Sequence, residues 1–141
     1  FGYIGATPMI FEATLLENIM YGNDLSVSNE DIYDYLRTLD TFKEEESYSL
    51  DRTINNKSLS SGQMQKIAFI RALLSKPEIL LLDESIANLD EDSKEIVLSI
   101  ISKQRHSIWY STVNVTGWRV SIESTSMCSA RKCIVTHIRL P

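Results

Sequence analysis

The sequence predicts an α/β domain, and three neighbouring segments carry that prediction. Ile79–Leu82 is a continuous apolar run of four residues, typical of a strand buried on both faces of a parallel sheet. Residues 91–104 then place apolar side chains at helical spacing, and residues 108–113 are again rich in residues that favour strands. A strand, a helix and a strand in this order are the pattern of a parallel α/β fold.

Length and composition limit the possibilities further. A chain of 141 residues is long enough for one domain with a single core, and 43% hydrophobic with 23% charged residues is a globular composition. No apolar run approaches the roughly 18–20 residues that cross a bilayer. The chain opens with FGYIGATP and carries no signal peptide, so we expect it to be a piece of something longer.

The elements before the apolar strand are predicted from their caps and stops. We expect Gly2–Ile4 to be the end of a strand and residues 14–21 to form a short helix that Gly22 closes. Ser28 is the expected N-cap of a helix over residues 29–42.

Two longer helices flank the apolar strand. Helical spacing of apolar residues begins at Met64 and ends before Pro77, which stops the helix. Asp90 is the expected N-cap of a second helix over residues 91–104. We expect no regular element after Val113.

The turn Ser60-Ser61-Gly62 is the first candidate site. It precedes a helix, where free backbone N–H groups and the positive end of the helix dipole favour an anion. Gly62 would let a ligand approach the backbone, and the Ser60 hydroxyl would add a hydrogen bond. Taken alone, the same residues also fit an ordinary serine N-cap.

The second candidate site is the acidic pair Asp83 and Glu84, directly after the apolar strand. Ligands of open α/β sheets collect at the carboxyl ends of strands. An aspartate there can hold Mg²⁺, and the next carboxylate can orient or deprotonate a water, two tasks that phosphoryl transfer requires. Taken alone, the pair also fits an acidic strand-to-loop turn.

Together the two candidates match the spacing of a known family. The run LSSGQMQKIAFIRALLSKPEILLLDESIANLD resembles the ATP-binding cassette (ABC) ATPases. Residues 59–63 resemble the LSGGQ signature, residues 79–84 the Walker B strand with its catalytic glutamate, and residues 85–90 the D-loop. Upstream, residues 2–8 lie where the family has its Q-loop. Residues 11–22 resemble the segment that follows the Q-loop in exporter-type members.

The resemblance implies a fold and a composite ATP site. It covers residues 1–113, which would form a partial P-loop NTPase domain truncated at its N-terminus. Domains of this family pair head to tail around two ATP molecules. The turn at residues 60–62 would then contact the γ-phosphate of the ATP that the partner domain holds. Gln63 would support that turn, and Asp90 would couple the two sites.

The same resemblance implies the metal ligand and the transport context. Asp83 would coordinate Mg²⁺ through water, and Glu84 would polarise the attacking water. In exporters, residues 6–11 would face the coupling helices of the transmembrane domains, which puts the chain at the cytoplasmic face of a membrane. The intact protein would couple ATP binding and hydrolysis to export.

Because of four departures from the family pattern, we expect this chain alone to hydrolyse ATP weakly or not at all. None of the five glycines opens a G-x-x-x-x-G-K-[ST] loop, so the sequence lacks the Walker A phosphate cradle. Ala6 stands at the Q-loop glutamine and Val113 at the switch histidine, and neither side chain is polar. His137 has a similar local context, but it lies further from Glu84 than the family spacing. Ser61 replaces the first signature glycine, a mild change if its φ is negative.

The last part of the chain has a different composition. Residues 1–104 hold nine Lys and Arg against 18 Asp and Glu, a net charge of −9, whereas residues 105–141 carry +4. We interpret residues 114–141 as an irregular tail: either an out-of-frame or degenerate read, or a genuine divergent C-terminus. Cys128 and Cys133 fit a zinc half-site or a disulfide, and no further cysteine completes a cysteine-rich site.

Other functions stay open beside the exporter subunit. The net charge of −5 argues against a nucleic-acid partner. The chain could also be a catalytically silent partner, which supplies only its signature turn to the ATP of another subunit, or a pseudogene product. The head of a chromosome-maintenance-type ATPase is disfavoured, because about 50 residues without sustained heptads separate Ala6 from the signature. Without its first strand and phosphate-loop helix the domain would leave apolar sheet surface uncovered, so we expect partial folding or aggregation.

Overall fold

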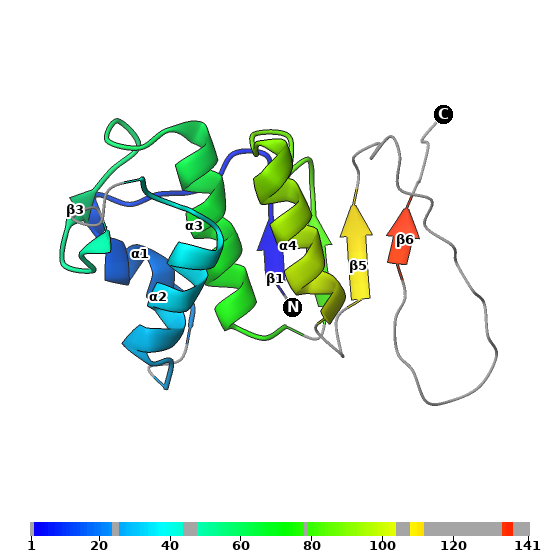
Figure 1. The fold of residues 1–141 in the computed structure, drawn as a ribbon, viewed down its shortest axis with the longest axis horizontal. Coiled ribbons are helices and arrows are strands. Elements are labelled where there is room, and N and C mark those ends of the chain that lie inside the picture. The colour runs from blue at the N-terminus through cyan, green and yellow to red at the C-terminus, as the bar shows by residue number, and fades with distance from the viewer. Residues whose placement is uncertain are drawn as a thin grey trace.

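A four-stranded parallel sheet is the main element of the computed structural model, which describes residues 2–23, 26–43, 48–77, 79–103, 108–111 and 134–136 (Figure 1). The strands run in the order β1-β4-β5-β6, and their bounds are Gly2–Ile4, Ile79–Leu82, Ile108–Ser111 and Ile134–Thr136. A second, antiparallel sheet pairs β2 (Ala13–Thr14) with β3 (Thr53–Ile54). The predicted order of strand, helix and strand is confirmed from β4 to β5.

The register of β1 against β4 depends on a glycine. Gly2 lies opposite Leu80 in the parallel pair. A Cβ atom at Gly2 would lie 3.0 Å from Cδ1 of Leu80 and 3.2 Å from Cγ of Pro77. Because contacts this short force a neighbour to move, glycine is what allows β1 to approach β4 so closely.

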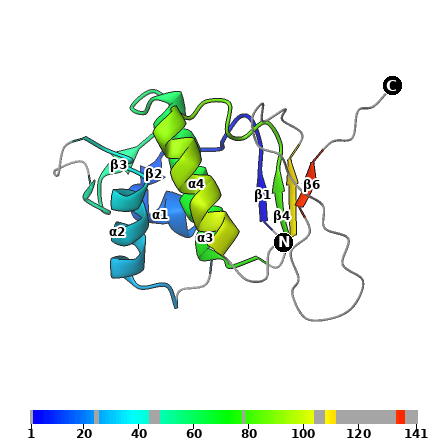
Figure 2. The ribbon, with the colours of Figure 1, turned by 45° about the vertical axis from the view of Figure 1, so that its right-hand side comes forward.

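Four helices lie on one side of the main sheet (Figure 2). They are α1 (Leu15–Met20), α2 (Asn29–Thr38), α3 (Ser61–Leu74) and α4 (Glu91–Lys103). The first three begin at hydroxyl N-caps, whose side-chain oxygens accept a backbone N–H three residues further on: Thr14, Ser28 and Ser60. These starts agree with the sequence prediction at Ser28.

Helix α2 ends four residues before the predicted boundary. Asp40 adopts the left-handed conformation with φ of 44°, a place where glycine is usual. Its N–H donates to the carbonyl of Arg37 at 2.9 Å, and the N–H of Thr41 donates to the carbonyl of Leu36 at 3.0 Å. These two bonds form a Schellman turn, which closes the helix before residue 42.

The hydrophobic core lies between α3 and the other helices and beneath the sheet. In α3 every residue from Gln65 to Ile70 is buried, so this helix is covered all round. The largest fully buried side chains come from α1, α2 with its C-cap, α3 and the strands β1, β3 and β4: Ile4, Leu15, Ile19, Ile32, Leu36, Leu39, Ile54, Ile67, Phe69, Ile70, Leu73 and Leu80.

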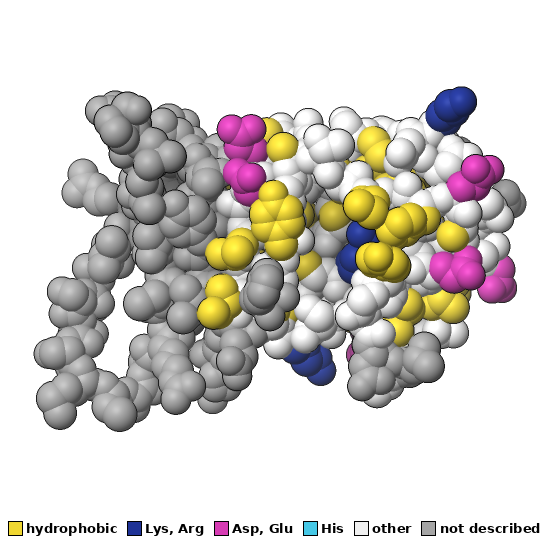
Figure 3. All heavy atoms as spheres, turned by 180° about the vertical axis from the view of Figure 1, so that it is seen from behind, with side chains coloured by type: hydrophobic (Ala, Val, Ile, Leu, Met, Phe, Trp, Pro, Cys, Tyr) yellow, Lys and Arg dark blue, Asp and Glu magenta, His cyan; other side chains and the backbone are white. Residues whose placement is uncertain are grey.

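The opposite face of the sheet is open in the described part of the chain. Leu80 and Leu82 are buried under the helices, but Ile79 is 41% exposed and Tyr3 is 60% exposed. Figure 3, the view from behind, shows apolar side chains on this face. The prediction that β4 is buried on both faces is therefore wrong here, because the helices cover one face only.

The C-terminal part contains one strand that the sequence did not predict. Ile134–Thr136 forms β6 and pairs in parallel with β5, with Ser111 opposite Thr136. The expectation of an irregular tail is wrong for these three residues, because so short a strand shows no alternation of its own and is defined by its distant partner. The predictions on Val113, Cys128, Cys133 and His137 concern residues outside the part of the chain that the structure describes.

Candidate functional site

The turn before α3 is closed by a reciprocal pair of hydrogen bonds. The backbone N–H of Gln63 donates to Oγ of Ser60 at 3.2 Å, and the backbone N–H of Ser60 donates to Oε1 of Gln63 at 2.9 Å. This capping box satisfies two backbone donors at the helix start. The alternative interpretation of Ser60 as a helix N-cap is confirmed, and Gln63 is the other half of this capping box.

The same turn keeps the features of an anion site. Ser60 and Ser61 are exposed at the start of a 14-residue helix, whose first N–H groups have no partner within the helix. Ser61 is not among the described residues with positive φ, so its replacement of glycine causes no backbone strain. A Cβ atom at Gly62 would lie 3.3 Å from the carbonyl oxygen of Asn88, so the missing side chain admits this neighbour.

The acidic pair lies at the carboxyl end of β4, as predicted. The Asp83 N–H donates to the carbonyl of Ile4 at 2.9 Å, which fixes the strand end. The Tyr3 hydroxyl donates to Oδ2 of Asp83 at 3.2 Å. Desolvation and this hydrogen bond to a carboxylate raise the pKa of Tyr3 above its ordinary value. Tyr3 therefore remains a neutral hydrogen-bond donor to Asp83 at physiological pH.

Glu84 has an unfavourable backbone conformation. Its φ is 50°, in the left-handed region that costs a side-chain-bearing residue about 1–2 kcal/mol. The side chain is exposed, whereas the next residue, Ser85, is buried. The chain thus turns sharply at Glu84 and presents the carboxylate to solvent at the end of the sheet.

Asp90 is the N-cap of α4, as predicted. Its Oδ1 accepts the N–H of Ser93 at 2.8 Å, and its Oδ2 accepts the Ser93 hydroxyl at 2.9 Å. These bonds from the Ser93 backbone and side chain lower the pKa of Asp90, with a smaller contribution from the nearby ammonium of Lys66.

The segment at the Q-loop position is held through its backbone. The Ala6 carbonyl accepts the Asn88 side-chain amide at 3.1 Å, and the Gly5 carbonyl accepts Nε2 of Gln65 at 3.3 Å. The Ala6 side chain itself is exposed and makes no polar contact. Sequence reasoning missed Gln65 and Asn88, because their partners are carbonyl groups, which every residue has.

Arg71 is the second feature that sequence reasoning missed. Its Nε donates to the Asn18 carbonyl at 2.7 Å, and its Nη2 donates to the Met9 carbonyl at 3.1 Å. The guanidinium also lies 6.0 Å from the ring centroid of Phe11 and 5.7 Å from that of Tyr21. Desolvation lowers its pKa, but an arginine remains charged. The sequence does hold one signal for Arg71, because a charged residue among the apolar residues of α3 indicates a buried, paired side chain.

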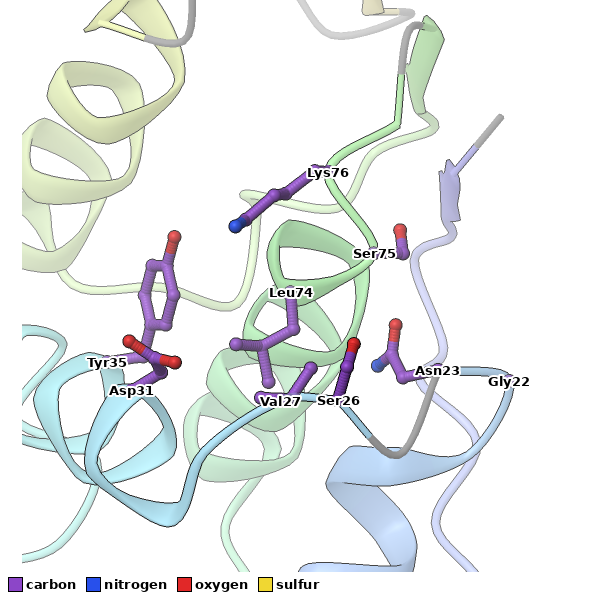
Figure 4. Close-up of a pocket in the computed structure, with 9 residues that line it drawn as sticks. All are labelled: Gly22, Asn23, Ser26, Val27, Asp31, Tyr35, Leu74, Ser75 and Lys76. Atoms are coloured by element: carbon purple, nitrogen blue, oxygen red, sulfur yellow. The ribbon is translucent and has the colours of Figure 1, made fainter.

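One cavity of about 420 Å³ lies apart from these motifs (Figure 4). It is lined by Gly22, Asn23, Ser26, Val27, Asp31, Tyr35, Leu74, Ser75 and Lys76. Figure 4 shows Lys76 reaching over the space from the end of α3, with Asp31 and Tyr35 on the side of α2. None of the predicted site residues lines it, so it does not belong to the candidate site.

Comparisons with known proteins agree with the motif spacing. The model of the family described as "ABC transporter" matches residues 1–87. The chain is 33% identical over 109 residues to "ABC transporter B family member 26, chloroplastic" from Arabidopsis thaliana, covering 71% of this chain and 15% of that protein. It is 38% identical over 108 residues to "ATP-binding cassette sub-family B member 5" from Homo sapiens, covering 70% and 8%.

A solved structure shares the fold. "Structure of a bacterial Atm1-family ABC exporter with ATP bound" superimposes with a TM-score of 0.66 at 25% identity, covering 78% of this chain and 20% of that one. The chain therefore spans only a fifth or less of the proteins that it matches. In the described part of the chain, no helix is long and apolar enough to span a membrane.

Proposed function

The chain belongs to the ABC transporter family, and on that premise we propose that it is part of the ATP-binding domain of an exporter. The capped turn at residues 60–63 faces the ATP that a second such domain holds, in a head-to-tail pair. The whole protein couples ATP binding and hydrolysis to export across a membrane. The observation that carries the proposal is this turn, exposed at the start of α3 beside the loop that follows the acidic pair.

The residues present suit a phosphate group and its magnesium ion. The N-terminus of α3 offers backbone N–H groups and the Ser60 hydroxyl, which are the donors that a phosphate needs. Asp83 offers the oxygen ligand that Mg²⁺ prefers. Bound Mg²⁺ and ATP would supply the reactive phosphoanhydride and the cation that neutralises its charge.

The acidic pair divides the chemical work between its two members. Asp83, held by Ile4 and Tyr3, is the metal-holding residue. Glu84 carries an exposed carboxylate, which would orient and polarise the attacking water. Ala6 contributes no polar side chain to this work.

The exposed apolar residues near α1 suit a contact with transmembrane domains. Met9 is 62% exposed and Tyr21 is 59% exposed. Figure 3 shows a second group of apolar side chains on the rear face toward this helix. We assign this surface to the cytoplasmic ends of the transmembrane domains, which puts the chain at the membrane.

The proposal is tested by ATP-dependent association. The chain is mixed with a complete exporter nucleotide-binding domain that has its own phosphate loop, and complex formation is followed by sedimentation with and without Mg²⁺ and ATP. We expect association only with ATP. Ser60→Ala should weaken it about tenfold, because a hydrogen bond to a charged phosphate is lost. Phosphate release in the same mixture distinguishes an active pair from a silent one.

Ser28→Ala is the matched control. Ser28 caps α2 as Ser60 caps α3, and its Oγ accepts the Asp31 N–H at 3.1 Å. Each substitution should therefore cost about 1 kcal/mol of stability through the lost cap. Only Ser60→Ala should weaken the complex. Equal weakening by both variants, or association that ignores ATP, would contradict the proposal.

A further inference from the structure

Lys66 is a charged residue on α3 whose side chain is buried. Its side chain is 9% exposed, within the stretch of α3 that is covered all round. Its Nζ donates to the carbonyl of Asp40 at 3.0 Å and lies 3.7 Å from Oδ2 of Asp90. Burying an ammonium group is costly unless it is paired, so these two partners account for a lysine at this position.

The two partners belong to opposite ends of two different helices. Asp40 is the left-handed residue of the Schellman turn that closes α2, where the helix dipole favours a cation. Asp90 is the N-cap of α4 and the last residue of the loop at residues 85–90. One ammonium group on α3 thus joins the end of α2 to the beginning of α4.

Lys66 also lies close to the candidate site along its own helix. It follows Gln63 by three residues, so it lies on the turn of α3 next to the capping box. Asn88 of this loop, which is exposed, also contacts the exposed Ala6 and the half-buried Gly62. The Lys66 side chain is 9% exposed and the Asp90 side chain 64%, so the hydrogen bond from the ammonium group to the Asp40 carbonyl is the stronger of its two contacts.

We propose that Lys66 is a positioning residue, which holds the loop at residues 85–90 and the end of α2 in one arrangement with the capped turn. The value of this positioning by Lys66 rests on the proposed function, in which the capped turn and Asp90 together face a second domain. A shift of α2 is then carried through the Lys66 ammonium to Asp90.

The test compares amide exchange at the two ends of this link, in the full chain without nucleotide. Lys66→Met keeps the buried stem and removes the charge. The reporters are the N–H of Thr41 in the Schellman turn and the N–H of Ser93, which donates to Asp90. We expect exchange at both to rise about tenfold, and Lys66→Arg to restore the slower rates.

Lys94→Met is the matched control. Lys94 pairs with Glu91 on the surface of α4, with Nζ 2.7 Å from Oε1, so the variant removes a positive charge near the same N-cap. It should leave exchange at Thr41 unchanged. A rise at only one reporter in Lys66→Met, or the same rise at Thr41 in Lys94→Met, would overturn the proposal.

A further variant decides the matter if Lys66→Met does not fold. Asp90→Asn weakens one contact of the ammonium and leaves Asp40 in place. We expect it to speed exchange at Thr41, across the link, and an unchanged rate there would overturn the proposal. Because nucleotide is absent throughout, a failure of ATP-dependent association would count against the proposed function and would leave these rates as they are.

Discussion

Arg71 offers a direct test of how α1 and the segment before it are held on α3. Arg71→Met keeps an apolar stem and removes the guanidinium, which donates to the carbonyls of Asn18 and Met9 and lies over the Phe11 and Tyr21 rings. These are four interactions of one side chain, so a single substitution removes all four.

The expected cost follows from the exposure of each contact. The partly buried bond to Asn18 contributes about 2 kcal/mol as a hydrogen bond from a charged donor, and the exposed bond to Met9 about half of that. The two ring contacts add about 1 kcal/mol together. Methionine avoids the desolvation of a charge, which offsets part of the loss. We therefore expect Arg71→Met to lower the free energy of unfolding by about 3 kcal/mol.

Arg37→Met is the matched control for the assay, which is urea unfolding followed by far-UV circular dichroism. Arg37 also lies over a ring, that of Tyr33 at 5.6 Å, and pairs with Glu30 and Asp34 at 3.8 and 3.9 Å. These groups are mostly exposed, so their loss should cost about 0.5 kcal/mol or less. Equal destabilisation by the two variants would refute the role of Arg71 in holding α1 and the segment before it on α3.

Three further predictions concern stability. The pKa of Asp90 is lowered in the folded state, so its capping bonds stabilise the fold above the unfolded-state pKa of about 3.9 and are lost as pH falls through the lower folded-state pKa. The urea midpoint should therefore fall less between neutral and acid pH in Asp90→Asn than in the wild type. Identical pH profiles of the two proteins would contradict this prediction. Gly22→Ala should cost about 1 kcal/mol in the same urea assay although no atom lies within 4 Å of the added Cβ, because φ is 80°; a neutral result would show that the turn adapts. Leu36→Ala should cost about 2–5 kcal/mol, because Leu36 is fully buried, and a loss below 1 kcal/mol would contradict its place in the core.

Local patterns allowed the helix starts to be predicted. Ser28, Ser60 and Asp90 each cap a helix through a bond to a residue three positions on, so the signal and its partner lie in the same short segment. The end of α2 was placed too late because Asp40, not glycine, takes the left-handed position. β6 was missed because only its pairing with β5 marks it as a strand.

The contacts that connect the site could not be predicted in the same way. Lys66 reaches a carbonyl 26 residues away, and Arg71 reaches carbonyls 53 and 62 residues away. A carbonyl has no signature in the sequence, so only the fold shows which one a buried cation meets. The candidate segments at residues 60–63 and 83–84 could be singled out because their spacing is local, and their roles toward ATP and Mg²⁺ stay predictions.

The left-handed backbone at Glu84 bears on how this position can change over time. Asparagine adopts such a conformation more readily than glutamate, and glycine adopts it without steric cost. Substitution of Glu84 by asparagine or glycine should therefore not destabilise the fold through the backbone. Under the proposed role of Glu84, a lineage that keeps glutamate here keeps it for its carboxylate, and a lineage that no longer hydrolyses ATP is expected to lose it early.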